Sequence, residues 1–115
     1  MRFPYDFIVL PDVLEHIPIE KHPVLFKSLS ASLNDDGSIV IHLPNPYYLA
    51  YLREHDPESL QIIDQPLYTN LLTDNIYGNG LFIHCLNSYS IWTIESDYQV
   101  IVLRKKPPAD YSYGD

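Results

Sequence analysis

Two groups of residues in this chain could do chemistry, and each follows an apolar run. Asp12, Glu15 and His16 come just after residues 7–10, and Asn45 comes just after residues 39–43. A carboxylate that ends an extended segment lies at the carboxyl end of a strand, where open α/β sheets bind their ligands. Asp12 would also suit an ordinary turn, because aspartate favours turns. The pattern alone leaves both interpretations open.

The first half of the chain predicts a strand, a helix and a second strand. The first strand covers residues 5–10, and its unbroken apolar run is typical of a strand covered on both faces. A helix is predicted over residues 23–33, because leucines recur every four residues and proline fits the first turn. Residues 34–37 should end this helix, with Gly37 in the left-handed conformation. The second strand covers residues 38–43, and so long a connection predicts a parallel pair with a right-handed crossover.

The second half is less regular. Asn45 should cap a helix over residues 46–54. Short helices are possible after Asp56 and over residues 67–72. Residues 81–86 suit a helix or a strand, and the helix is favoured because Asn79 offers a cap. An antiparallel hairpin is predicted from residues 89–94 and 99–103.

The composition excludes several classes of function. The chain has 15 acidic and 7 basic residues, a net charge of −8. Nucleic-acid binding is not expected, because contacts to phosphates need a basic surface. No apolar run is long enough for a membrane span. A single cysteine, Cys85, excludes an internal disulfide and fits a reducing compartment, so we expect a cytoplasmic protein.

Two segments resemble a known family. Asp12-Val-Leu-Glu-His-Ile17, after a strand, resembles the fourth conserved motif of class I S-adenosylmethionine-dependent methyltransferases. Leu33-Asn-Asp-Asp-Gly-Ser-Ile-Val-Ile-His-Leu-Pro-Asn45 resembles the polar turn and fifth strand of that family, at the expected separation. The resemblance implies an α/β fold over residues 1–106, a partial Rossmann-like sheet. It would have two parallel strands with a crossover helix and a C-terminal antiparallel hairpin, followed by a flexible tail at residues 107–115.

The resemblance covers only the second half of the family's domain. The four glycines, at positions 37, 78, 80 and 114, form no G-x-G-x-x-G motif, and no strand precedes Tyr5. The family binds S-adenosylmethionine mainly through such a glycine-rich loop and an acidic residue after its second strand. The resemblance therefore implies that this chain lacks the cofactor-binding half and does not bind S-adenosylmethionine alone.

The resemblance also implies roles for single residues. Asp12 would help to position cofactor or acceptor, and His16 would be the nearest base. The implied cofactor contacts are Leu10, Pro11 and Asp12. The implied acceptor-pocket residues are Asn45, Tyr47 and Tyr48. Tyr47 and Tyr51 also have helical spacing, and for them an ordinary packing pair is the favoured interpretation.

A metal site is a minor alternative. Some family members that methylate oxygen hold a divalent metal with an E-x-x-E-H run at this place. The set Asp12, Glu15 and His16 could hold Mg²⁺ or Mn²⁺, with His42 or His55 as a further ligand. The favoured interpretation has no metal, and His16 then orders the turn by hydrogen bonding.

Three functions remain open. The chain could be a fragment of a methyltransferase, or a truncated one, that acts on a small-molecule or sugar acceptor and is inactive alone. It could instead be a non-catalytic remnant that serves as an interaction module. Its first strand would then be an exposed edge that pairs with a partner or with a second copy in a homodimer. An unrelated small α/β binding protein is the third possibility.

Overall fold

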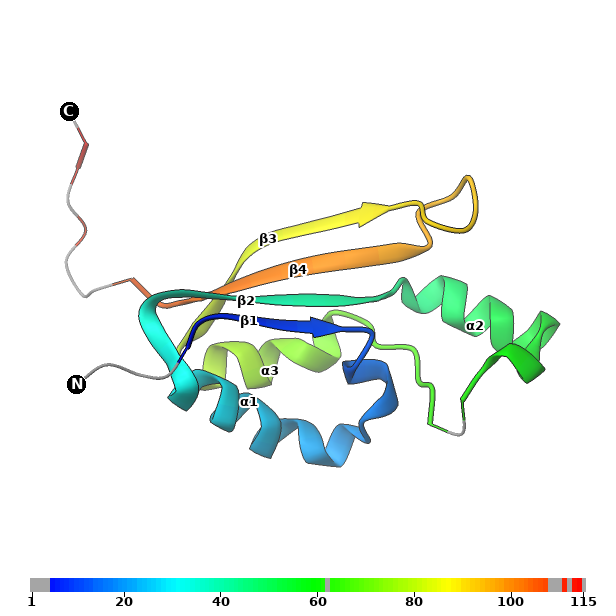
Figure 1. The fold of residues 1–115 in the computed structure, drawn as a ribbon, viewed down its shortest axis with the longest axis horizontal. Helices are drawn as coiled ribbons and strands as arrows, with labels where there is room; N and C mark the ends of the chain where they lie inside the picture. Colours follow the sequence, from blue (N-terminus) through cyan, green and yellow to red (C-terminus); the bar gives the residue numbers. More distant parts are fainter. Residues whose placement is uncertain (1–4, 62, 108–110, 112, 115) are drawn as a thin grey trace.

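The computed structural model describes residues 5–61, 63–107, 111 and 113–114. Three of its helices are short 3₁₀ helices, labelled η. In chain order the elements are β1 (Tyr5–Pro11), η1 (Leu14–His16), η2 (Ile19–Lys21), α1 (His22–Ser32), β2 (Leu33–Pro44), α2 (Pro46–His55), η3 (Pro57–Ser59), α3 (Asn70–Gly78), β3 (Leu81–Tyr89) and β4 (Tyr98–Lys105). The strands form one sheet in the order β1-β2-β4-β3, with β1 at an edge (Figure 1).

The predicted parallel pair is confirmed. β1 and β2 run parallel, with Phe7 opposite Ser38 and Pro11 opposite His42, and α1 lies in the connection between them. β4 pairs antiparallel with both β2 and β3. Because β1 and β2 run in the same direction, their carboxyl ends meet at one edge of the sheet.

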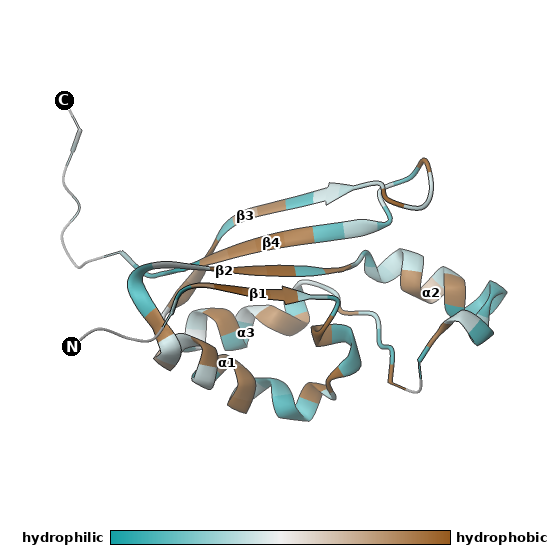
Figure 2. Cartoon of the chain, in the orientation of Figure 1, coloured by the Kyte–Doolittle hydropathy of each residue, from teal (hydrophilic) through white to brown (hydrophobic). Residues whose placement is uncertain are grey.

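The core lies between one face of the sheet and the helices α1 and α3 (Figures 1 and 2). Alternate residues of β2 and β4 point into it, as the two-residue period of a strand requires. The buried cluster consists of Leu14, Phe26, Leu29, Leu33, Ile39, Ile41, Leu43, Leu67, Leu72, Ile76, Leu81, Ile101 and Leu103.

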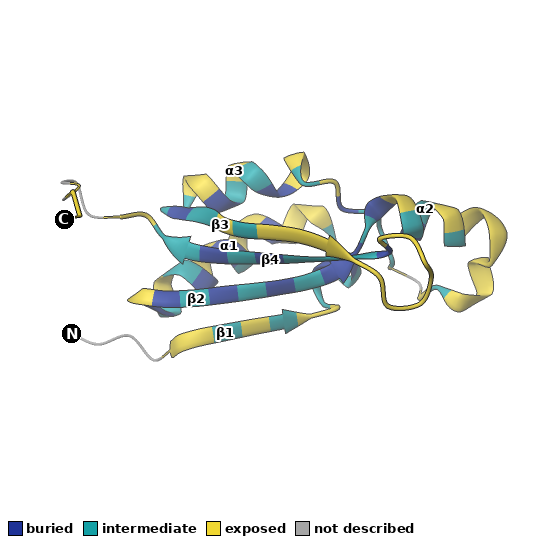
Figure 3. Cartoon of the chain, turned by 90° about the horizontal axis from the view of Figure 1, so that it is seen from above, coloured by how far each residue is buried: buried dark blue, intermediate teal, exposed yellow. Residues whose placement is uncertain are grey.

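The opposite face of the sheet is covered by none of the described helices (Figure 3). Phe7 and Val9 of β1 are 60% and 48% exposed. Val9 lies in register with Val40 of β2, which lies in register with Val102 of β4. The prediction that the first strand is covered on both faces is therefore wrong for this chain, because α1 and α3 lie on the same side.

The glycine turn predicted after α1 is also wrong. Leu33–Pro44 is one strand with Gly37 buried inside it, and of the described glycines only Gly80 has a positive φ, at 71°. A Cβ added to Gly37 would lie 2.6 Å from Cδ1 of Leu33 and 2.8 Å from the backbone oxygen of Asp6. Glycine is needed at position 37 because the backbones of β1 and β2 approach closely there.

Asn45 caps α2 as predicted. Its Oδ1 accepts a hydrogen bond from the backbone N–H of Tyr47 at 3.0 Å, and Pro46 occupies the first turn. The Asn45 amide side chain also donates to the backbone oxygen of Ser96 at 2.9 Å. The Asn45 backbone N–H donates to the backbone oxygen of Asp97 at 2.8 Å. One residue thus fixes both the start of α2 and the loop that precedes β4.

The prediction of a helix over residues 81–86 is wrong. Leu81–Tyr89 forms strand β3, which pairs with β4 from Leu81 opposite Lys105 to Tyr89 opposite Tyr98. This pairing outweighs the weak capping preference of Asn79, which instead follows the end of α3. The predicted hairpin exists but is displaced, because its strands are β3 and β4 and residues 90–97 form the loop between them.

The remaining expectations concern short segments. η3 begins at Pro57, directly after Asp56, as proposed, whereas the helix expected over residues 67–72 lies further along, at Asn70–Gly78. The flexible tail predicted for residues 107–115 lies largely outside the described residues. Among the described residues, no helix has both the length and the apolar character that crossing a membrane requires.

Candidate functional site

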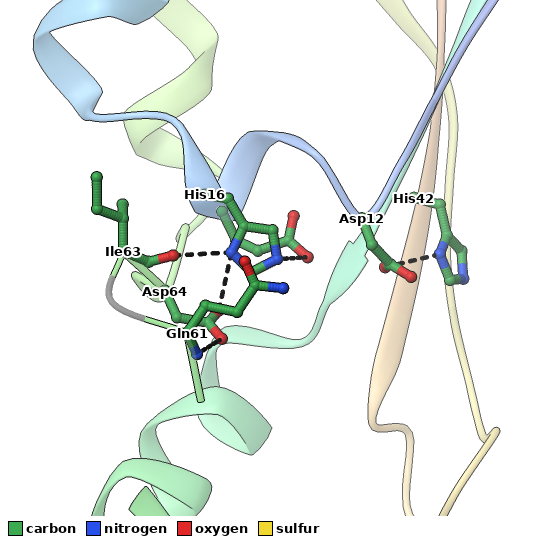
Figure 4. A network of polar contacts seen from close by, with 7 residues as sticks. Asp12, His16, His42, Gln61, Ile63 and Asp64 are labelled. Carbon is green, nitrogen blue, oxygen red and sulfur yellow. Dashed lines mark hydrogen bonds and ion pairs between the residues drawn. The ribbon is translucent and has the colours of Figure 1, made fainter. Parts of the chain in front are cut away.

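Asp12 and His42 join the carboxyl ends of β1 and β2. The backbone N–H of Asp12 donates to the backbone oxygen of His42 at 2.8 Å. Oδ1 of Asp12 lies 3.1 Å from Nδ1 of His42 (Figure 4). Asp12 has a φ of 54° and is the only non-glycine residue in the described part of the chain with a positive φ. Strained backbone of this kind clusters at functional sites, and aspartate tolerates it better than most residues.

His16 points away from Asp12 (Figure 4). Its Nδ1 donates to the backbone oxygen of Ile63 at 2.7 Å, and its Nε2 lies 3.9 Å from Oε2 of Glu15. The two residues implied to be catalytic therefore share one turn but have different partners. The contact with Ile63 is a hydrogen bond of the kind expected if His16 orders the turn, the interpretation favoured over a metal ligand.

Glu15 is a buried carboxyl group beside this turn. Only 2% of the residue is exposed, and its Oε1 has no hydrogen-bond partner. Burial, with smaller contributions from the charges of Asp12 and Asp64, raises the pKa of Glu15 to about 7. A carboxyl group with such a pKa can gain or lose a proton near neutral pH. The sequence analysis considered Glu15 only as a minor metal ligand.

The three residues implied to contact the cofactor differ in exposure. Leu10 packs against the core, whereas Pro11 and Asp12 are exposed at the end of the edge strand. Only the last two present their side chains to solvent beside the open edge of β1.

The possible metal ligands are not brought together. In residues 5–61, 63–107, 111 and 113–114, no group of three or more His, Cys, Asp or Glu side chains lies where it could hold a metal ion. His42 contacts Asp12. The ring of His55 stacks on Tyr51, with ring centroids 4.1 Å apart.

The three residues implied to form the acceptor pocket line a single hollow. It has a volume of about 520 Å³, and we call it the tyrosine pocket because Tyr47, Tyr48 and Tyr51 line it beside Asn45. Its opposite wall is part of the loop between β3 and β4. Tyr47 packs edge-on against Tyr68, and Tyr51 stacks on His55. These contacts, rather than the suggested packing of Tyr47 on Tyr51, hold the exposed rings.

The loop over residues 90–97 is held by Asp97, which the sequence analysis did not identify. The carboxylate of Asp97 is buried and accepts hydrogen bonds at 2.8 Å from the backbone N–H groups of Ile91, Trp92 and Thr93. Burial acts to raise the pKa of Asp97, but these backbone hydrogen bonds outweigh it and hold the pKa below its usual value. An aspartate at the end of a loop rich in serine and threonine typically accepts hydrogen bonds from the backbone amides of the turn. This sequence pattern could have identified Asp97 as the residue that orders the loop.

A second hollow, of about 250 Å³, lies between the turn at residues 12–16, α2, residues 59–61 and Asp64, and we call it the acidic pocket. The carboxylates of Asp12, Glu15 and Asp64 line it, together with Tyr48 and Tyr98. Tyr48 also lines the tyrosine pocket, so the two hollows are neighbours. The sequence analysis missed Asp64 and Tyr98, because only the folded chain brings these distant segments together.

Comparison with known proteins identifies the family. A family model described as a methyltransferase domain matches residues 3–96. No curated protein sequence matches the chain significantly. Among solved structures, an S-adenosylmethionine-dependent methyltransferase from Mesorhizobium loti superimposes with a TM-score of 0.72 at 12% identity, covering 91% of this chain and 63% of its own.

Two other solved structures agree. An S-adenosylmethionine-dependent methyltransferase from Archaeoglobus fulgidus gives a TM-score of 0.71 at 15% identity, covering 90% of this chain and 61% of its own. Magnesium protoporphyrin IX methyltransferase from Synechocystis was solved with bound S-adenosylhomocysteine. It gives a TM-score of 0.66 at 15% identity, and the match covers 92% of this chain and 47% of the methyltransferase chain. This chain thus spans about half to two thirds of the length of these structures. It belongs to the class I S-adenosylmethionine-dependent methyltransferase family.

Proposed function

We propose that this chain forms the acceptor side of a methyltransferase domain that acts on a small-molecule or sugar acceptor. The observation that supports this most is the position of the Asp12–His42 junction and the two pockets, which gather around the carboxyl ends of β1 and β2. Ligands of open α/β sheets bind at this edge.

The residues of this chain do not fit S-adenosylmethionine by themselves. Gly37 lies inside β2, Gly78 ends α3 and Gly80 precedes β3. None of them stands between the end of a strand and the start of a helix, where a glycine-rich loop would approach the cofactor. Pro11 and Asp12 provide one exposed wall beside the open edge of β1. We therefore propose that the cofactor-binding half comes from residues outside these 115, and that the chain is inactive without them.

The residues present would orient the acceptor and move its proton. Reactions between two bound molecules gain mainly from proximity and orientation. Asn45, Tyr47 and Tyr48 would orient the acceptor in the tyrosine pocket, and Asp12 would fix its position beside the cofactor. His16 would act with Glu15 as the base, because its Nε2 faces the carboxyl group of Glu15.

Calorimetry on two lengths of polypeptide tests this proposal. The 115-residue chain is compared with the same chain extended by the reading frame that precedes residue 1, or co-expressed with the neighbouring gene product. We expect one S-adenosylmethionine bound per extended or paired molecule and no saturable binding by the 115 residues alone. Absence of binding in every extended form would contradict a methyltransferase half, and saturable binding by the short chain would contradict the missing cofactor site.

A second function, a non-catalytic module that forms a homodimer, is favoured by a different observation. Tyr5, Phe7 and Val9 are exposed on the edge strand β1, beside the uncovered face of the sheet. An exposed apolar edge strand is a template for pairing with another strand. Two copies joined through β1 would extend the sheet and cover these side chains.

Light scattering after gel filtration tests the dimer. The dimer interpretation predicts that Val9→Lys gives monomers, because it places a charge on the paired edge. Val24→Lys is the matched control, since Val24 is 72% exposed but belongs to α1 and not to the edge strand, and this variant should remain dimeric. A monomeric parent chain would contradict the dimer.

A further inference from the structure

Two buried oxygen atoms of the acidic pocket lack hydrogen-bond partners. They are Oε1 of Glu15 and Oδ1 of Asp64. Glu15 is 2% exposed, and the side chain of Asp64 is 9% exposed. Buried polar atoms are nearly always paired, because leaving them unpaired costs free energy. Both residues line the acidic pocket, so each can turn an oxygen toward a donor there without giving up a hydrogen bond that this oxygen already makes.

The positive charge available nearby is small. His16 is the only basic side chain that lines the pocket, and neither lysine nor arginine is among its described lining residues. Nδ1 of His16 lies 3.8 Å from Oδ1 of Asp64, but its hydrogen bond goes to the backbone oxygen of Ile63. One imidazole thus faces three carboxyl groups, Asp12 being the third. An anion would be repelled here, whereas a cation would be attracted.

The other walls of the pocket are aromatic and aliphatic. The rings of Tyr48 and Tyr98 have centroids 6.5 Å apart. Burial, helped by nearby carboxylates, raises the pKa of both hydroxyl groups, so both rings stay uncharged at neutral pH. Pro44, Leu49, Leu52 and Leu60 add apolar surface, and the polar side chains of Ser59 and Gln61 complete the lining. Uncharged aromatic rings beside carboxylates bind ammonium groups, and apolar walls suit alkyl substituents on the nitrogen.

We propose that the acidic pocket binds an alkylated ammonium group, and that the acceptor is a cationic, nitrogen-containing small molecule. This inference rests on the proposed function, since it assigns a substrate class to the acceptor side. Oε1 of Glu15 and Oδ1 of Asp64 receive the positive charge, and Tyr48 and Tyr98 contact the alkyl groups. The tyrosine pocket next to it, which Tyr48 also lines, holds the rest of the acceptor.

Titration of the 115-residue chain with choline tests the site, followed by NMR of the backbone amides. The matched probe is dimethylbutanol, the uncharged isostere in which carbon replaces the nitrogen of choline. We expect choline to bind at least about tenfold more tightly than the alcohol, because the cation interacts with the carboxylates and the aromatic faces. The largest shifts should fall at residues 12–16 and 48–52, at residues 60 and 61, and at Asp64. Equal binding of the two probes, or no binding of choline, would overturn the proposal.

Three variants assign the effect to the pocket. Glu15→Gln and Asp64→Asn keep the side-chain shape and should each weaken choline binding about tenfold. Asp64→Asn serves as the second test if Glu15→Gln fails to fold. Glu20→Gln is the control, because Glu20 is an exposed acid on η2 outside the pocket, and it should leave choline binding unchanged. Undiminished binding in both pocket variants would overturn the site. No step uses S-adenosylmethionine, so this result is independent of whether the extended chain binds the cofactor.

Discussion

The carboxylate of Asp12 lies 3.1 Å from Nδ1 of His42, and this contact links the ends of two parallel strands at the edge where the pockets lie. The backbone of Asp12 has a φ of 54°, in the left-handed region. The same residue therefore carries a strained backbone conformation and a side chain at the proposed site.

Substitution of Asp12 should separate these two roles. A residue with a side chain pays roughly 1 kcal/mol for a positive φ, and glycine does not. We expect Asp12→Gly to keep the free energy of unfolding within about 1 kcal/mol of the parent chain, and Asp12→Ala to lie about 1 kcal/mol below Asp12→Gly. Urea denaturation measures both. Both variants should weaken choline binding, and an Asp12→Ala chain as stable as Asp12→Gly would refute the strain at this position.

Glu15 should make stability depend on pH in one direction. Its pKa is about 7 in the folded chain and 4.5 as the reference value, so the folded state binds the extra proton between these values. The contribution of this proton to the free energy of unfolding is fully present below pH 4.5 and is lost as the pH rises through 7. The loss amounts to up to about 3 kcal/mol. Glu15→Gln should flatten this dependence and should be more stable than the parent chain at pH 8. Urea denaturation at several pH values measures the effect, and parallel profiles for the two proteins would contradict it.

Glu15 should also make choline binding depend on pH. The cation prefers the ionised carboxylate, so affinity should increase as the pH rises through about 7. Glu15→Gln should remove this increase, which NMR titrations at pH 6 and pH 8 would measure. A parent chain whose choline affinity is the same on both sides of pH 7 would contradict this role of the carboxylate.

Asp97 should control the order of the loop that carries the chain's single tryptophan, Trp92. Asp97→Asn replaces one acceptor oxygen with a donor that opposes the backbone N–H groups, so fluorescence anisotropy of Trp92 should fall. Acidification of the parent chain should have the same effect, since the lowered pKa keeps Asp97 charged until the pH falls through it. Glu95→Gln is the control because its side chain is exposed. Unchanged anisotropy in Asp97→Asn would show that other contacts order the loop.

Two glycines offer a matched test of packing. Gly37→Ala would place its methyl carbon 2.8 Å from the backbone oxygen of Asp6, and overpacking of this kind costs about 1–3 kcal/mol. At Gly78, at the end of α3, no atom beyond its chain neighbours and the backbone of its own helix lies within 4 Å of an added carbon, so Gly78→Ala should be neutral or stabilising by up to about 1 kcal/mol. Thermal unfolding compares the two variants. Similar melting temperatures would show that β1 and β2 tolerate a wider spacing at Gly37.

The sequence predicted those parts of the fold that local signals determine. The apolar runs of β1 and β2, the leucine period of α1 and the Asn45 cap each lie within a few neighbouring residues. The parallel arrangement followed from the length of the connection alone. Asn45, Tyr47 and Tyr48 follow the second strand, where the family resemblance implies an acceptor pocket, and they line one hollow.

Features that depend on distant segments were not predictable in the same way. β3 is a strand because β4 pairs with it, and nothing within residues 81–86 decided this against a helix. Asp64 and Tyr98 reach the acidic pocket from segments that are far from Asp12 in the sequence. The uncovered face of the sheet was not predictable for a related reason. A continuous apolar run indicates that both faces of a strand can be buried. It does not indicate whether a segment of this chain covers each face.

The most direct test of the account is to map where S-adenosylhomocysteine contacts this chain within the extended or paired protein. Amide shifts in a labelled sample measure this. We expect the largest shifts at residues 10–12 and 42–45, the carboxyl ends of β1 and β2, and small shifts near Gly37 at the opposite end of β2. Shifts centred on Gly37, or none in this chain when the cofactor product is bound, would contradict the assignment of the site.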